Sequence, residues 1–165
     1  MCFFKNLRCE WRTFVSSPVK FFIPAVITVA VGWLVWLSSD GITVVWKASF
    51  HPAGTLPLWL MFSLWIAVYF MYGLLVSIGK LCSLGTELCG KSVVAYVASL
   101  FWCPTVLLAG VGICGLCAII TSLAYTLYIL KFYARISVIG TVCSLFIVIF
   151  EVYLLFFTVG FTILN

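Results

Sequence analysis

The sequence predicts an all-α membrane protein: a single domain, residues 1–165, built as a polytopic bundle of five transmembrane helices. Hydrophobic residues make up 65% of the chain and charged residues only 8%, with a mean hydropathy of +1.30. Such a chain cannot cover a water-exposed surface with polar groups, which excludes a soluble domain. Five long apolar runs then divide the sequence into membrane spans.

The five runs each come close to the roughly 20 residues that cross a bilayer core. They cover about residues 21–38, 58–78, 92–108, 112–130 and 136–164. The boundary between the third and fourth runs is the least defined, because Pro104 and nearby glycines mark a turn but no charge interrupts the stretch. A four-span count therefore stays open.

Basic residues support the five-span count. With the N-terminus inside, the inner segments hold eight of the nine lysines and arginines, and only Lys47 lies outside. This bias places the loop of residues 39–57 on the same outer face as the C-terminus. The basic residues are dispersed along the chain and form no patch, so a nucleic-acid partner is not expected.

The chain has eight cysteines and none in the outer loop, so reduced thiols are expected. Cys114 and Cys117 form a CxxC motif near the outer end of a span. A membrane thiol oxidoreductase of this type relays electrons to a second cysteine pair in an outer loop. That pair is missing, so this enzyme class is the less favoured alternative.

No soluble-enzyme constellation is present: the chain has a single histidine, no paired acids, no phosphate-binding glycine loop and no metal-ligand cluster. Catalytic residues and a metal site are therefore not predicted. Binding is favoured over catalysis, although enzyme activity stays an open question.

The second span carries large aromatic residues on one face. Pro57 suits the first turn of a helix that begins at Leu58, and Trp65, Tyr69 and Gly73 then recur every four residues. Trp59 fits an interfacial aromatic belt. Trp65 and Tyr69 lie deeper, where their N–H and O–H groups need partners, so the spacing favours a protein-lined pocket for a flat, mostly apolar ligand.

This spacing, Pro-x4-Pro-x-Trp-x5-Trp-x3-Tyr-x3-Gly, resembles the loop and second helix of the translocator protein (TspO) family. It is formed by Pro52, Pro57, Trp59, Trp65, Tyr69 and Gly73, with looser likeness at Val31-Gly32-Trp33 and Trp102-Cys103-Pro104. The resemblance implies a binding protein for tetrapyrroles (porphyrins, haem) or sterols, with no required cofactor. It also implies the mitochondrial outer membrane, or another organelle membrane, in a eukaryote.

The resemblance implies a ligand pocket beneath the first outer loop. Its candidate residues are Pro57, Trp59, Trp65, Tyr69, Ser99, Trp102, Cys143 and His51. Trp65, Trp102 and Tyr69 would stack on the ligand, and Ser99, in place of the family's asparagine, would offer a hydrogen bond. His51 is either a solvated loop residue or a lid residue, including as an axial contact to a porphyrin iron.

Two further features stand outside that pattern. Leu130, Tyr133 and Arg135 fit the loose cholesterol-contact pattern, although tyrosine and basic residues gather at membrane interfaces anyway, and in the family the motif belongs to the fifth helix. Glu151 lies within the last span, where a carboxylate costs a few kcal/mol unless it is protonated, paired or facing water. It is either a functional acid or a neutral one hydrogen-bonded to a neighbouring helix.

The expected partners are the lipid bilayer and a small apolar ligand, with a second copy of the chain as a candidate. The competing class is a non-enzymatic viral or organellar membrane assembly protein, packed through glycine and alanine, with its aromatic residues facing lipid. Whether Trp65 and Trp102 face one cavity distinguishes the two classes.

Overall fold

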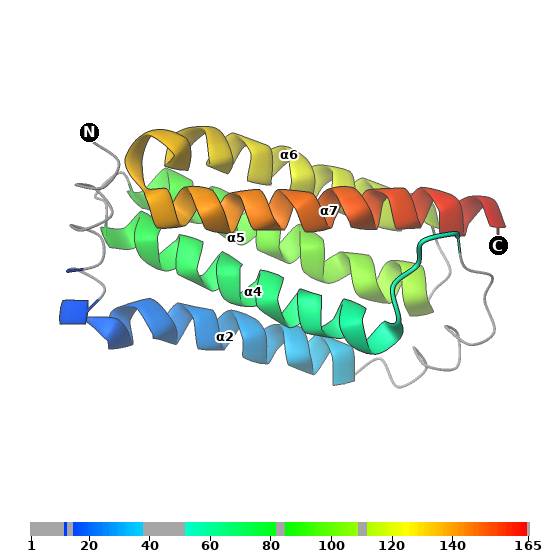
Figure 1. The fold of residues 1–165 in the computed structure, drawn as a ribbon, viewed down its shortest axis with the longest axis horizontal. Helices are drawn as coiled ribbons and strands as arrows, with labels where there is room; N and C mark the ends of the chain where they lie inside the picture. Colours follow the sequence, from blue (N-terminus) through cyan, green and yellow to red (C-terminus); the bar gives the residue numbers. More distant parts are fainter. Residues whose placement is uncertain (1–11, 13–14, 38–51, 82–84, 109–111, 165) are drawn as a thin grey trace.

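A computed structural model describes residues 12, 15–37, 52–81, 85–108 and 112–164. Over these ranges the chain is an all-α bundle of long helices: α2 (Pro18–Leu37), α4 (Leu58–Leu81), α5 (Gly85–Cys103), α6 (Gly112–Ile136) and α7 (Val138–Leu164). All five are long and apolar enough to cross a membrane. The predicted five-helix membrane fold is confirmed. The helices run side by side, with α2 on one flank and α6 and α7 on the other (Figure 1).

Helix α2 approaches α4 closely because two glycines leave room for it. A Cβ atom at Gly73 would lie 2.2 Å from the Cα atom of Ala25, and one at Gly32 would lie 2.1 Å from the ring of Tyr69. Small residues at such positions let membrane helices pack backbone against backbone. The face of α4 that carries Tyr69 and Gly73 is therefore a helix-packing face.

Hydrogen bonds between side chains and backbone carbonyl groups add to this contact. The Thr28 hydroxyl donates to the Tyr69 carbonyl at 2.8 Å, and the Ser77 hydroxyl donates to the Phe21 carbonyl at 2.9 Å. The Tyr96 hydroxyl of α5 donates to the Thr28 carbonyl at 2.7 Å. These bonds join α2 to both α4 and α5.

Helix α5 passes at Pro104 into a short π-helical stretch, η1 (Pro104–Leu108). Proline has no N–H to continue the helical hydrogen-bond ladder. In the next residue, the Thr105 hydroxyl donates to the carbonyl oxygens of Phe101 at 2.7 Å and Trp102 at 3.0 Å. The third span therefore continues through Pro104 as a distorted helix.

Ser137 alone separates α6 from α7, and its side chain caps the second helix. The Gly140 amide donates to Ser137 Oγ at 2.9 Å, the usual bond of an N-cap residue. A Cβ at Gly140 would lie 2.4 Å from the Tyr133 ring. The two helices therefore reverse direction tightly around a buried tyrosine.

The described end of the loop that precedes α4 packs against α7 (Figure 1). The amide of Thr55 donates to the carbonyl of Pro52 at 3.2 Å, and Gly54 within that turn has φ +84°, as a type II turn requires. The Leu56 amide then donates to Tyr153 Oη at 2.9 Å. This segment crosses the same end of the bundle at which α7 ends.

Several helices extend beyond the predicted apolar runs. Helix α5 begins at Gly85 and α6 continues to Ile136, because charged residues are tolerated where a span meets the interface. Lys91 there pairs with Glu87 one turn earlier and lies 3.7 Å from the centre of the Tyr128 ring.

Candidate functional site

Trp65 and Trp102 lie together inside the bundle. Their ring centroids are 4.9 Å apart in a T-shaped contact, and 2% and 0% of their surfaces are exposed. Tyr69 stacks beside Trp65 at 6.2 Å, Trp36 of α2 meets Trp65 edge-on at 5.5 Å, and Phe157 of α7 contacts Trp102 at 6.0 Å. We call these five side chains the aromatic cluster.

The rings of the aromatic cluster fill the space between the helices. The cavity that touches Trp65 and Tyr69 has a volume of about 10 Å³, barely enough for a single water molecule. A planar macrocycle would have to separate the rings to enter. The residues predicted to stack on a ligand thus contact one another instead.

Among the buried polar atoms described in this region, some have a hydrogen-bond partner and others do not. Trp102 Nε1 donates to Thr158 Oγ1 at 2.6 Å. Trp65 Nε1 and Ser99 Oγ are buried without a hydrogen-bond partner among the described residues. Ser99 lies one turn before Trp102 on α5. Its hydrogen bond to a ligand stays a prediction.

The other predicted pocket residues lie elsewhere. Trp59 is 69% exposed, as an interfacial residue would be, and Pro57 is also exposed. Cys143 is buried in α7, but it precedes Phe157 by fourteen residues, which is about 21 Å of helix. His51 lies outside the described residues.

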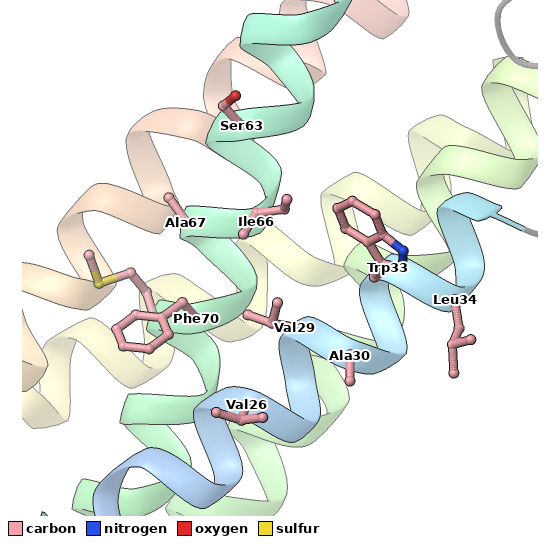
Figure 2. A pocket seen from close by; sticks show the side chains of 10 residues that line it. Val26, Val29, Ala30, Trp33, Leu34, Ser63, Ile66, Ala67 and Phe70 are labelled. Carbon is pink, nitrogen blue, oxygen red and sulfur yellow. The ribbon is translucent and has the colours of Figure 1, made fainter.

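A groove with an apolar lining runs between α2 and α4, and sequence reasoning missed it. It has a volume of about 870 Å³, and Figure 2 shows its side chains reaching from both helices. The groove is lined by Val26, Val29, Ala30, Trp33, Leu34, Ser63, Ile66, Ala67, Phe70 and Met71. Residues of these types are common in any membrane span, so they do not mark a binding site in the sequence. The small side chains of Ala30 and Ala67 were the one sign of a groove.

A second polar centre surrounds Glu151, whose side chain is fully buried. Its Oε1 accepts a hydrogen bond from Tyr72 Oη of α4 at 2.6 Å and another from Ser122 Oγ of α6. Tyr72 Oη also lies 3.0 Å from Ser122 Oγ and 3.1 Å from Thr126 Oγ1. We call these four residues the Glu151 cluster.

The sequence had identified Glu151 but not its partners. Ser122 and Thr126 are four residues apart in an apolar run, a spacing that puts both hydroxyls on one face of α6. Pairing them with Tyr72 and Glu151 required the helix arrangement. The structure shows the hydrogen bonds to neighbouring helices that one interpretation of Glu151 had predicted.

The remaining sequence candidates occupy different environments. Tyr133 is buried and donates to the Leu75 carbonyl at 2.6 Å, whereas Leu130 is half-buried and Arg135 is exposed. The cholesterol-contact pattern therefore does not form one surface. Cys114 and Cys117 are free thiols on the exposed side of α6.

Comparisons with known proteins identify no relative for this chain. No family model matches it, and neither a curated protein nor a solved structure does.

Proposed function

We propose that this multi-pass membrane protein binds a rigid, mostly apolar ligand of the sterol class in the groove between α2 and α4. The volume of the groove, about 870 Å³, carries the proposal, because small-molecule sites commonly measure about 300–1,000 Å³. Its walls are apolar side chains, which suits a ligand that partitions into the bilayer. Binding without catalysis is the activity this groove supports.

The lining favours a sterol over a porphyrin. None of the ten residues that line the groove is charged, so the carboxylates of a porphyrin would lose water without gaining a cationic partner. A sterol has one hydroxyl group. Ser63, one turn and a half into α4, lies at one end of the groove and is its hydroxyl-bearing residue (Figure 2).

The shape of the groove supports the same ligand class. Val29 and Ile66 lie in the middle of the groove, while Trp33 and Phe70 offer flat rings on opposite sides (Figure 2), and the small side chains of Ala30 and Ala67 leave room beside them. Rigid ring systems lose little conformational freedom when they settle on such a surface. The resemblance to the translocator protein family points to sterols or tetrapyrroles, and to an organelle membrane such as the mitochondrial outer membrane.

Crosslinking of a photoreactive sterol to the purified, reconstituted protein tests this proposal. Ala30→Phe should fill the groove and weaken sterol binding about tenfold or more, equivalent to about 1.4 kcal/mol. Ala124→Phe is the matched control, because Ala124 is also exposed but lies on α6. Peptide mapping should place the crosslink on α2 or α4.

Three outcomes would overturn the proposal. Equal crosslinking in both variants would mean that the sterol does not occupy the groove. A change of oligomeric state in Ala30→Phe, with sterol binding intact, would identify the groove as an interface between copies. Quenching of tryptophan fluorescence by protoporphyrin IX that is lost in Trp65→Leu, without sterol binding, would shift the site to the aromatic cluster.

A further inference from the structure

Glu151 lies at the midpoint of α7, as far from either end of the helix as a residue can be. The other charged residues in the described helices lie near helix ends: Lys20, Lys80, Glu87, Lys91, Lys131 and Arg135. The only salt bridge in the described ranges joins Lys91 to Glu87. Glu151 therefore has hydroxyl groups as partners where a buried carboxylate would require a cation.

The hydrogen atoms available to the Glu151 cluster can be counted. Thr126 Oγ1 donates to the Ser122 carbonyl at 2.9 Å, and Tyr72 Oη donates to Glu151 Oε1. Ser122 has one hydroxyl hydrogen, yet Glu151 Oε1 and, at 2.9 Å, the Ala95 carbonyl of α5 both lie in reach as acceptors, and Tyr72 Oη lies 3.0 Å away. One more hydrogen is needed for both contacts to be hydrogen bonds.

A proton on Glu151 supplies the missing hydrogen. The carboxyl O–H then donates to Ser122 Oγ, and Ser122 donates onward to Ala95. Glu151 Oε2, which is buried without a partner, becomes the carbonyl oxygen of a neutral acid. With an ionised carboxylate, the same atom would be a partly charged oxygen isolated from water, which is far more costly.

The spacing of the oxygen atoms fits a proton better than a metal ion. Tyr72 Oη lies 2.6 Å from Glu151 Oε1 and 3.0 Å from Ser122 Oγ, which are distances across a hydrogen bond. A bound cation such as Ca²⁺ sits 2.3–2.6 Å from each oxygen ligand and so holds its ligands further apart. The described residues also contain no group of three or more histidine, cysteine, aspartate or glutamate side chains that could hold a metal ion.

We propose that the Glu151 cluster is an intramembrane proton-binding site whose occupancy is coupled to the packing of α4, α5, α6 and α7. Uptake converts a carboxylate and a proton from water into the neutral acid, and release returns the proton to water. The protonated network joins Tyr72, Ser122, Ala95 and Glu151, one residue from each helix. Release leaves a charge that the closed bundle cannot solvate, so it favours a more open, hydrated arrangement.

Among the described residues, few other titratable groups face the site. From α4 and α5 these are Tyr72 and Tyr96, whose rings lie 5.8 Å apart. Helix α6 presents Ser122 and Thr126, which do not titrate in the accessible pH range. On α7, Tyr153 instead bonds to Leu56, and Cys143 lies two turns away. The carboxyl group of Glu151 is therefore the group that binds the proton.

Infrared spectroscopy of the full chain in lipid vesicles at neutral pH tests the proposal. The parent should show the carbonyl stretching band of a neutral carboxyl group, with a shift in D₂O because the proton exchanges. Glu151→Gln should lose this band while keeping its helical circular dichroism, because the amide group has a similar shape and can also donate to Ser122. Glu87→Gln, which changes an exposed glutamate, should keep the band.

Tyr72→Phe provides a second readout that does not depend on removing the acid. Loss of the Tyr72 hydroxyl should shift the carboxyl band without abolishing it, and this variant decides the matter if Glu151→Gln does not fold. A parent without the band, a band retained in Glu151→Gln, or no shift in either D₂O or Tyr72→Phe would overturn the proposal. Loss of the band when sodium replaces choline at constant pH would also overturn it and indicate an alkali-cation site.

Discussion

Helices α2 and α7 are both strongly apolar, yet they are joined to the bundle by different interactions. Helix α2 packs closely on α4 because Gly32 and Gly73 have no side chains. Hydroxyl groups that donate to backbone carbonyls add to this contact. Helix α7 is held by bonds between side chains, from Glu151 to α4 and α6 and from Thr158 to Trp102 of α5. The apolar character that the two helices share does not reveal this difference in their contacts.

The difference reflects the solvent. Lipid tails are as apolar as leucine, so hydrophobic burial does not drive one membrane helix onto another, and close packing and hydrogen bonds must do so. In the most apolar stretch of α2 only 22% of the residues are buried, against 44% in α7, so α2 is free to present a groove to lipid. Helix α7 instead contributes the polar centre of the bundle.

Enlarging Gly73 should give the largest loss of stability. Gly73→Ala places a methyl group against the backbone of Ala25, and overpacking of this kind typically costs about 1–3 kcal/mol. Unfolding of the reconstituted protein, followed by circular dichroism or by steric trapping, measures the change. The α2–α4 contact should be lost first, so sterol crosslinking should fall with it.

Gly90→Ala is the control for the Gly73 substitution. Gly90 has open space around it on α5, so the added methyl group meets nothing and improves helix propensity by up to about 1 kcal/mol. Opposite signs for the two alanine variants would support a packing role for Gly73. Equal effects would show that α2 and α4 do not approach as closely as described.

Two tryptophan substitutions in the aromatic cluster test whether the hydrogen bond from Trp102 to Thr158 of α7 contributes to stability. Trp102→Phe removes the donor to Thr158, and hydrogen bonds between membrane helices contribute about 0.6–1.7 kcal/mol. Trp65→Phe removes an N–H that has no partner, so its loss of stability should be smaller by about 1 kcal/mol. If Trp65→Phe proves the more damaging change, its indole N–H has a partner and the assignment of polar contacts is wrong.

The five spans could be predicted from the sequence because each is recognised by the length of its own apolar run, without knowledge of its neighbours. Some of their ends were missed by several residues: the third run was predicted to begin at residue 92 and the fourth to end at residue 130, whereas α5 begins at Gly85 and α6 ends at Ile136. The groove was not predictable, because Ala30 and Ala67 form a depression only when α2 lies beside α4. The partners of Glu151 were hidden for the same reason: Tyr72 is 79 residues away along the chain.

The loop that precedes α4 should respond to changes at its turn. Gly54→Ala puts a side chain at φ +84°, and a left-handed conformation costs an alanine about 1 kcal/mol. Tyr153→Phe removes the acceptor of the Leu56 amide. Both variants should speed hydrogen exchange at Leu56 several-fold, while the global free energy of unfolding changes by less than about 1 kcal/mol. Unchanged exchange in both would mean that this segment is not anchored on α7.

Replacing the two exposed thiols of α6 should have the smallest effect. Cys114 and Cys117 are free and face outward, so they contribute neither to the glycine contacts of α2 nor to the Glu151 cluster. The Cys114→Ser, Cys117→Ser double variant should change the free energy of unfolding by less than about 0.5 kcal/mol, as surface substitutions usually do. It should also keep sterol crosslinking, and the parent should migrate identically on reducing and non-reducing gels. If the parent transfers electrons to a quinone and the double variant does not, the thiols are catalytic, and the binding function proposed for the groove would give way to an oxidoreductase.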